Sequence, residues 1–474
     1  MFNQNKYGKI PAYAVTISAL LLAFFCLLLS PRQTDAYIWP SYDGSLRVPV
    51  ADSTLLIDPA QDMTYDELGI FYALYDCLFV IDDINNVRQN LVESFQTSDN
   101  FTRYVFKLKN NITFSDTTKL KSADVISSLE NNLRRIGDRG DAFENIAQMK
   151  TIDENSFEII LKIADPDLPR KLAHPFCAIT KGAGSEVSAG STYFFHFIGT
   201  GAFLLDEVGT RRVRLIRNEN YHRGKAYLKA IEFEIASNEE ESFLRFTSGK
   251  LDIHRVPFTQ YGELMRRQGV NLSNRTGLDT IILDFANRSR MGSLISYVNP
   301  SELVNVILNH AGTGTTGILP DDEIKFPATN SFKRPATSLQ QIVLGYYGDK
   351  NLLEPVARRI ATEWESYGLK VEVMRIDSYP SGSCDAVVRI VKTIGQDSDF
   401  IWRSTRSSLG TTGKMPLNTD IFLSPEKDEE REYLAKGNFL PIARPYITYA
   451  LSDKTRNFRL IAGCVPDYWS ISLD

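Results

Sequence analysis

The longest apolar stretch of the chain lies near its N-terminus, where an uncharged run extends from Pro11 to Ser30. This run has roughly the 20 residues that a helix needs to cross the ~30 Å hydrocarbon core of a bilayer. Lys6 and Lys9 precede it and favour a cytoplasmic N-terminus, so the chain after Ser30 is expected to be exported. Residues 1–36 are therefore predicted to be either a cleaved signal peptide or an uncleaved membrane anchor.

Beyond this run, the hydrophobic residues switch repeatedly between period two and helical spacing. From Arg103 to Lys109 they alternate with polar residues, which predicts a strand with one exposed face. Ser122 is expected to cap a helix that Gly137 ends. Further strands are predicted at 46–50, 157–163, 203–205, 213–216, 231–235, 369–373, 447–451 and 469–473, and helices at 66–75, 239–247 and 353–364.

The later part of the chain contains the pattern of a βαβ unit. An apolar helical stripe from Leu353 to Trp364 is terminated by Gly368, and residues 369–373 then alternate as a strand. Strands and helices are mixed in the same way throughout the exported chain. The sequence therefore predicts a mixed α/β architecture in at least two lobes.

The composition of the chain says more about its possible functions than about its fold. The 474 residues are 43% hydrophobic and 23% charged, as in ordinary globular proteins, and the length suggests two or three domains. The net charge is −5, the pI is about 5.7, and no long block of lysine or arginine occurs. A nucleic-acid partner is therefore not expected.

No catalytic or metal-binding motif stands out. The five histidines form no HExxH or similar ligand pair, and neither a Gly-x-Ser-x-Gly elbow nor a phosphate loop is present. Residues 312–317 read GxGxxG but follow a helical pattern at 302–310 instead of a strand, so we interpret them as a flexible loop. Asp397 and Asp399 are interpreted as solvated carboxylates. We expect no enzyme activity, no metal and no cofactor.

Four cysteines follow the apolar run, at Cys77, Cys177, Cys384 and Cys464. An even number permits disulfides in an oxidising compartment. Their wide separations form no CxxC or zinc-ligand spacing. The four cysteines are interpreted mainly as small buried hydrophobic residues. One disulfide is also allowed, and the sequence does not decide which two cysteines would form it.

Three segments, taken in order, resemble one family. Residues 93–125, with YVFKLK, ITFSD and SADV, are similar to its stretch "tFhLrkgvkFhDGtpltaeDV". Residues 199–225 are similar to "GTGPY…lerNpdYwgGkp", and residues 246–253 to "l.sGevDi". Over most of its exported length the chain thus resembles the family 5 extracellular solute-binding proteins, which include the oligopeptide-, dipeptide- and nickel-binding proteins of ABC importers.

The resemblance implies an α/β periplasmic-binding-protein class II fold with two lobes around a cleft. The first lobe would comprise 37–284 plus 443–474, with an inserted subdomain at about 66–180, and the second lobe 285–442. The second lobe is short for the family after the strand at 281–285. Hinge closure around the solute is the expected motion.

The same resemblance implies which residues line the cleft. They are Ser53, Thr54, Thr200, Gly201, Phe203, Arg389, Ile394 and Asp397. In peptide-binding relatives, an acidic residue at about the position of Ile394 captures the amino terminus of the peptide. Without this carboxylate, a buried peptide ammonium would be unpaired, at a cost of several kcal/mol.

These features predict an extracytoplasmic substrate-binding protein of an ABC-type importer, for oligopeptides or a similar solute. Its partners would be the solute, the permease subunits, and the membrane through the N-terminal helix. It would reside in the periplasm or at the outer face of the cytoplasmic membrane. The alternative is a degenerate solute-binding fold that acts as a membrane-anchored sensor or assembly factor without transport. An exported hydrolase is a third possibility, for which the sequence offers no catalytic constellation.

Overall fold

The computed structural model describes residues 42–50, 53–61, 63–82, 86–136, 143–277, 279–285, 292–315, 317–318, 341–379, 383–391, 434, 439–461 and 464–474. The chain divides into two compact units, 1–40 and 41–474, and every described residue belongs to the second. The predicted signal peptide or anchor lies outside the described residues. Within the described ranges, no helix combines the length and apolar character needed to cross a membrane.

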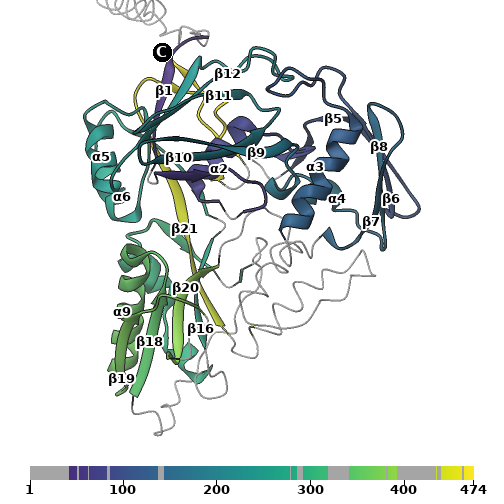
Figure 1. Cartoon of the computed structure of the whole chain (residues 1–474). Helices are drawn as coiled ribbons and strands as arrows, with labels where there is room; N and C mark the ends of the chain where they lie inside the picture. The colour runs from purple at the N-terminus through teal and green to yellow at the C-terminus, as the bar shows by residue number, and fades with distance from the viewer. Residues whose placement is uncertain are drawn as a thin grey trace, which may run out of the picture. The chain divides into compact units, whose positions relative to one another are not determined.

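The first sheet has four strands in the order β1 (Ser45–Val50), β13 (Ala230–Ile235), β12 (Arg212–Arg217) and β11 (Phe203–Val208). Only the β1–β13 pair is parallel. A three-stranded sheet of β2 (Thr54–Leu56), β10 (Thr192–Ile198) and β9 (Lys181–Ala189) packs into the same hydrophobic core, as does α2 (Tyr65–Leu74) (Figure 1).

A reciprocal pair of hydrogen bonds fixes the first turn of α2. The hydroxyl of Thr64 accepts from the backbone N–H of Glu67 at 3.3 Å, and the Glu67 carboxylate accepts from the backbone N–H of Thr64 at 2.8 Å. This capping box satisfies N–H groups that have no partner within the helix. The direction in which α2 leaves the preceding loop is therefore specified locally.

An antiparallel sheet of β5 (Val92–Ser98), β6 (Arg103–Leu108), β8 (Ser156–Leu161) and β7 (Ile146–Thr151) has a hydrophobic core of its own, to which α3 (Ser122–Arg135) contributes. Smaller elements lie beside it. They are β3 (Phe79–Ile81), β4 (Val87–Gln89), α4 (Leu168–Lys171) and a 3₁₀ turn (Pro175–Cys177).

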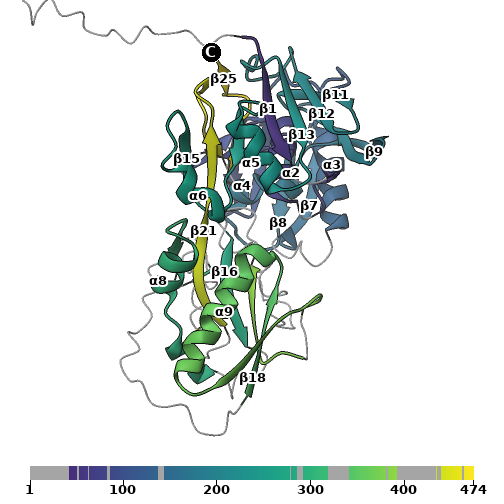
Figure 2. The same ribbon diagram turned by 90° about the vertical axis from the view of Figure 1, so that its left-hand side faces the viewer.

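The largest sheet is organised around β21 (Phe439–Leu451). Residues 446–451 of β21 pair with β14 (Ile253–Arg255) and β15 (Asn271–Thr276), while residues 439–445 pair with β16 (Thr280–Phe285) and β17 (Gly312–Gly314). The sheet continues from β16 through β20 (Ala386–Val391) and β18 (Gln341–Tyr347) to β19 (Lys370–Arg375). Figure 2 shows β21 as one continuous strand that runs past both groups of partners.

The predicted βαβ unit is confirmed. α9 (Lys350–Ser366) connects β18 to β19, which run parallel. Asp349 caps the helix by accepting from the backbone N–H of Asn351 at 2.9 Å, and Gly368 follows its end with a φ of +88°. Trp364 on the apolar stripe is completely buried, as expected of a core residue. The remaining elements are α5 (Glu239–Thr247), α6 (Phe258–Leu264), α8 (Pro300–Glu302), a π-helical turn (Leu303–Ile307), a 3₁₀ turn (Gly292–Tyr297), β22 (Thr455–Arg456), β23 (Leu460–Ile461), β24 (Val465–Pro466) and β25 (Ser472–Leu473).

Three local predictions were wrong. The N-cap of α3 is Lys121, because Ser122 is already helical and donates its hydroxyl to the carbonyl of Asp153. Residues 312–314 form β17 instead of a loop, because they pair with β21, and their own sequence does not predict this long-range pairing. The last strand is limited to Ser472–Leu473.

The four cysteines after the apolar run are all buried and unpaired. Burial raises the pKa of the thiols of Cys77, Cys177 and Cys464 above the ordinary value. Their interpretation as small buried hydrophobes is confirmed, and the one bridge for which the sequence left room is not formed.

Candidate functional site

The carboxyl ends of three strands lie close together, next to the first turn of α2. β1 ends at Val50, β13 at Ile235 and β14 at Arg255, and the start of α2 and the strand β21 lie beside them. In α/β proteins, ligands bind outside the carboxyl ends of strands. Two adjoining cavities of about 10 and 30 Å³ open here and share Pro49, Val50, Asp66 and Arg255 in their walls.

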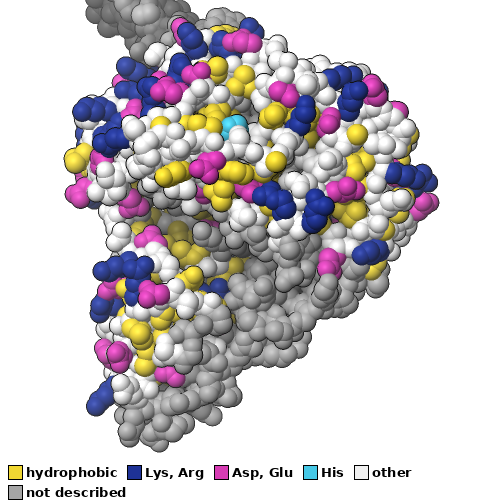
Figure 3. All heavy atoms as spheres, viewed as in Figure 1, with side chains coloured by type: hydrophobic (Ala, Val, Ile, Leu, Met, Phe, Trp, Pro, Cys, Tyr) yellow, Lys and Arg dark blue, Asp and Glu magenta, His cyan; other side chains and the backbone are white. Residues whose placement is uncertain are grey.

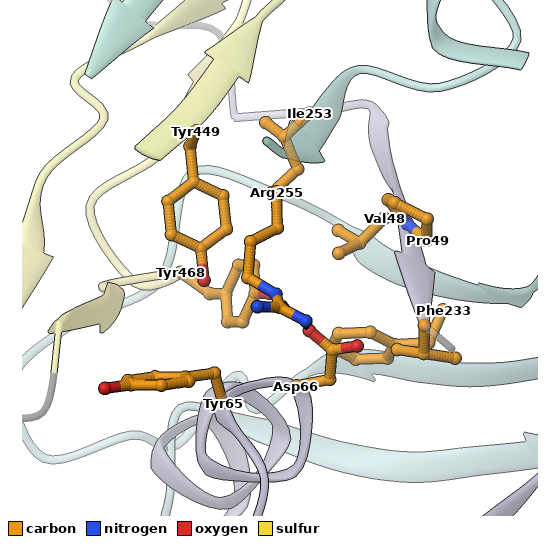
Figure 4. A pocket seen from close by; sticks show the side chains of 10 residues that line it. Val48, Pro49, Tyr65, Asp66, Phe233, Ile253, Arg255, Tyr449 and Tyr468 are labelled. Carbon is orange, nitrogen blue, oxygen red and sulfur yellow. Dashed lines mark ion pairs between the residues drawn. The ribbon is translucent and has the colours of Figure 1, made fainter. Parts of the chain in front are cut away.

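Arg255 and Asp66 form the charged centre of these cavities. Arg255 projects from the end of β14 and points toward Asp66 on the first turn of α2, with Nε 3.4 Å from Oδ1 (Figure 4). Burial by itself would lower the pKa of Arg255, but the negative charge of Asp66 contributes to raising it above its ordinary value. The two side chains are 40% and 18% exposed, so the pair is accessible from solvent.

Aromatic side chains enclose the ion pair. Tyr65, Tyr449, Tyr468 and Phe233 surround it, as Figure 4 shows. Burial raises the pKa of all three phenols well above the ordinary value. The phenols therefore stay neutral, and the hydroxyl of Tyr65 points away from the ion pair (Figure 4) and hydrogen-bonds Asp279.

The second cavity has a polar wall. His254 Nδ1 lies 2.9 Å from Ser242 Oγ, and its Nε2 lies 2.9 Å from Gln260 Oε1. Because an amide oxygen can only accept, Nε2 carries the proton and Nδ1 accepts from the serine. Burial lowers the pKa of His254, whereas burial and the nearby charge of Asp349 raise the pKa of Glu239 at the cavity edge. The wall thus combines a neutral imidazole with a carboxylate that accepts a proton more readily than usual.

The size of the cavities limits what they can hold. At about 10 and 30 Å³ they admit a charged or polar group, not a whole peptide. Among the described residues, no group of three or more histidine, cysteine, aspartate or glutamate side chains gathers as a metal site. The geometry favours capture of one end of a larger solute by Arg255 and Asp66.

Two of the residues nominated from the sequence lie close to this site along the chain. Ser53 and Thr54 are exposed, just after the carboxyl end of β1. The carbonyl of Ser53 accepts from the backbone N–H of Tyr193 at 2.9 Å, which fixes the start of β2. Their side chains remain free to face solvent.

Thr200, Gly201 and Phe203 are instead packed in the interior. The hydroxyl of Thr200 donates to the buried carboxylate of Asp76 at 3.1 Å, and Phe203 is 1% exposed in the core. The N–H of Gly201 donates to the carbonyl of Leu74 at 3.0 Å, at the end of α2. The structure brings these three residues together near the end of α2. None of them lines the cavities at Arg255.

Arg389 lies on β20, in the large sheet. Its Nη2 and Nε lie 3.0 and 3.2 Å from Oδ2 of Asp284 on β16, and its guanidinium covers the ring of Tyr379 at 4.5 Å. Both charged side chains are almost fully buried. Ile394 and Asp397 lie outside the described residues, so their proposed role stays a prediction.

Sequence reasoning missed Arg255 and Asp66. A signal was present for Arg255, because it lies two residues after the motif at 246–253. Asp66 was visible only as an acidic residue at a helix start, where it is ordinarily explained by the helix dipole. Nothing in the spacing of the two residues indicated that they meet.

Figure 3 shows how the charged side chains of the described residues are distributed over one face of the molecule. On this face, among the described residues, lysines and arginines are interspersed with aspartates and glutamates. A nucleic-acid-binding surface would gather basic side chains into a patch or stripe.

The described architecture is that of a periplasmic binding protein. NikA from Staphylococcus aureus, solved in complex with Ni(L-His)2, superimposes with a TM-score of 0.72 at 19% identity and covers 91% of this chain and 100% of its own. The oligopeptide-binding protein AppA from Bacillus subtilis, solved with a nonapeptide, has a TM-score of 0.68 at 15% identity and covers 92% of this chain and 100% of its own. These likenesses establish the fold.

The family follows from the sequence match. The profile described as "Bacterial extracellular solute-binding proteins, family 5 Middle" matches residues 86–411, and the chain belongs to this family. The glutathione-binding protein GsiB of Escherichia coli strain K12 is 25% identical over 289 residues, which are 58% of this chain and 56% of GsiB. The chain thus spans little more than half the length of the curated relatives it matches.

Proposed function

We propose that this chain is the extracytoplasmic solute-binding subunit of an ABC-type importer, with no catalytic activity. Its solute would be an oligopeptide or a similar small molecule, and its partners the permease subunits. Family membership supports this function. The single observation that carries it is the accessible Arg255–Asp66 pair at the carboxyl ends of β1, β13 and β14.

We further propose the lobe boundaries that the sequence suggested. Residues 37–284 and 443–474 would form the first lobe, with residues 66–180 as its inserted subdomain, and residues 285–442 the second lobe. The change of partners along β21 supports a hinge near residue 445, although β16 (Thr280–Phe285) packs with the strands and α9 of the second lobe. The site at Arg255 would then face the cleft between the lobes, and the segment 1–36 would direct export or hold the protein at the membrane.

The ion pair supplies a chemistry for both ends of a zwitterion. A solute carboxylate would take the place of Asp66 on the guanidinium of Arg255, because arginine binds carboxylates with two parallel hydrogen bonds. A solute ammonium would bind Asp66 or Glu239, whose carboxylates lie at the same cavity. This arrangement would compensate for the carboxylate that peptide-binding relatives have at the position of Ile394.

The test is ligand binding by the purified full chain. Peptide pools, glutathione, nickel–histidine complexes and sugars are added in turn, and thermal shift and native mass spectrometry report binding. We expect a peptide-like zwitterion to bind. Arg255→Gln should weaken its binding by at least about tenfold, which corresponds to about 1.4 kcal/mol. Arg211→Gln is the matched control, because Arg211 forms an exposed 2.7 Å pair with Glu241 and lines neither cavity.

A second candidate is a solute-binding fold that has become a membrane-anchored sensor or assembly factor. Two features favour it: Ile394 occupies the position of the missing carboxylate, and Arg255 already has a partner in Asp66. If no pool shifts the melting temperature and no small molecule co-purifies, this candidate replaces the importer.

A further inference from the structure

A larger cavity lies apart from the Arg255 site. Its volume is about 270 Å³, and we call it the basic cavity. It shares no lining residue with the cavities at Arg255. Three parts of the chain that are far apart in sequence build it. The first comprises β3, β4 and the residue after β6, the second is the turn at Arg223, and the third is the C-terminal region from Arg459 to Asp467. Its charged and amide side chains are Asp82, Arg88, Asn90, Lys109, Arg223, Arg459 and Asp467.

The charges around the basic cavity do not balance. Arg88 Nε is 2.8 Å from Asp82 Oδ2, and Arg459 Nη2 is 2.6 Å from Asp467 Oδ2, so both lining carboxylates already have an arginine partner. Lys109 and Arg223 remain. Within the described part of the chain, neither has a carboxylate oxygen within 4.0 Å. The lining therefore has an excess of two positive charges.

Arg223 is held in a defined orientation. Its guanidinium lies over the ring of Trp469, with Cζ 4.3 Å from the ring centroid, and the indole N–H of Trp469 donates to the carbonyl of Gly224 at 3.0 Å. Cation–π stacking engages the face of the guanidinium, part of its edge contacts the Tyr221 hydroxyl, and the other N–H groups are left for a ligand. An arginine fixed in this way loses less entropy when it binds an oxyanion.

Lys109 faces a like charge across the cavity. Burial lowers the pKa of Lys109 and the positive charge of Arg223 lowers it further, while the negative charge of Asp76 opposes part of this shift. The buried carboxylate of Asp76 is already hydrogen-bonded by Asn90 at 2.8 Å and Tyr221 at 3.0 Å. A bound anion would relieve the repulsion between the two cations.

We propose that the basic cavity binds a small oxyanion with at least two negative charges, held between Lys109 and Arg223. The ligand groups would be phosphates or carboxylates, because these accept bidentate hydrogen bonds from arginine. The volume of about 270 Å³ is slightly below the ~300 Å³ at which drug-sized ligand pockets begin, so it suits pyrophosphate or a tricarboxylate. This site is separate from the proposed solute site at Arg255.

The test is calorimetric titration of the full chain in phosphate-free buffer with pyrophosphate and, separately, with citrate. We expect saturable one-to-one binding of at least one of them, and the comparison tells whether phosphate or carboxylate groups are preferred. Lys109→Gln and Arg223→Gln should each weaken binding by about tenfold. Lys225→Gln should change it less than about twofold, because Lys225 lies outside the cavity and pairs with Glu219 at 2.7 Å. No saturable binding, or equal weakening by Lys225→Gln, would overturn the proposal.

Melting temperatures separate lost binding from lost folding. Without anion, Lys109→Gln should melt at or above the wild-type temperature, because the substitution removes a like charge. The anion should raise the melting temperature of the wild type and of Arg255→Gln, but not that of Lys109→Gln. An anion effect that disappears in Arg255→Gln and persists in Lys109→Gln would assign the anion to the solute site and contradict the proposal.

Discussion

At the scale of single residues, Asp76 connects parts of the chain that are far apart in sequence. Its carboxylate accepts from Asn90 Nδ2 at 2.8 Å, Thr200 Oγ1 at 3.1 Å and the Tyr221 hydroxyl at 3.0 Å. Burial by itself would raise the pKa of Asp76, but the imidazole of His222, with Nε2 3.5 Å from Oδ2, and the hydrogen-bond donors lower it below the ordinary value. The carboxylate is therefore ionised at neutral pH inside the protein.

This network predicts a loss of stability in acid. Because the pKa is lower in the folded than in the unfolded state, Asp76 stabilises the fold above about pH 4 and ceases to do so as the pH falls through the folded pKa. Asp76→Asn should lower the free energy of unfolding at pH 7 by about 2–3 kcal/mol and flatten its decline toward pH 3. Urea unfolding at several pH values measures both, and Asp82→Asn, an exposed pair with Arg88, should cost less than about 1 kcal/mol. Equal effects of the two substitutions would contradict this role.

Gly201 illustrates a position fixed by close approach. A Cβ there would lie 2.3 Å from the backbone carbonyl carbon of Leu74, whereas a Cβ at Gly314 would meet nothing within 4 Å. Gly201→Ala should destabilise the protein by about 1–3 kcal/mol, because the end of α2 must move. Gly314→Ala should change the free energy of unfolding by less than about 1 kcal/mol. Thermal unfolding of the two variants compares them directly, and similar melting temperatures would refute the packing argument.

At the scale of elements, the N-terminus of α2 positions the candidate site. Thr64 caps the helix, and Asp66 follows within its first turn. Thr64→Ala should therefore reduce the free energy of unfolding by about 1 kcal/mol, and it should also weaken solute binding through Asp66. Ser127→Ala, on the exposed face of α3, is a control that should leave both unchanged. If Thr64→Ala alters neither quantity, the cap does not control the site.

The strands and helices with clear periodicity were predictable, and β21 shows where prediction stops. The alternation at 103–109 and the stripe on α9 match β6 and α9 because one face of each is buried. In β21 only residues 447–451 were recognised, since Pro441 and Pro445 disfavour a strand and burial is nearly continuous. Pairing with strands on both sides overrides the local preference.

The candidate site was less predictable than the fold. The resemblance to family motifs directed attention to Thr200, Gly201 and Phe203, whose contacts are structural, because packing residues and ligand residues can occupy the same motif. Arg255 and Asp66 approach each other only after β14 has paired with β21 and α2 has docked. The approach of the two side chains depends on tertiary structure, and the periodicity of hydrophobic residues does not predict it.

At the scale of the whole molecule, Glu239 and Asp349 couple the site to the large sheet. Glu239 begins α5 at the edge of the second cavity, and Asp349 caps α9 between β18 and β19. Burial raises the pKa of Glu239, the positive charge of Arg255 opposes this rise, and the negative charge of Asp349 adds to it. We infer that the like charges of Glu239 and Asp349 would resist the approach of one proposed lobe to the other.

Protonation of Glu239 should therefore favour closure. A raised carboxyl pKa means that the charged form is disfavoured in the folded protein, so the penalty is greatest at neutral pH and fades as the pH falls through that pKa. We expect Glu239→Gln to give a smaller radius of gyration at pH 7 in X-ray scattering, and a smaller change between pH 7 and pH 5 than the wild type shows. Glu240→Gln, the exposed neighbour, should behave like the wild type. A Glu239→Gln variant with the wild-type radius at both pH values would show that this repulsion does not control closure.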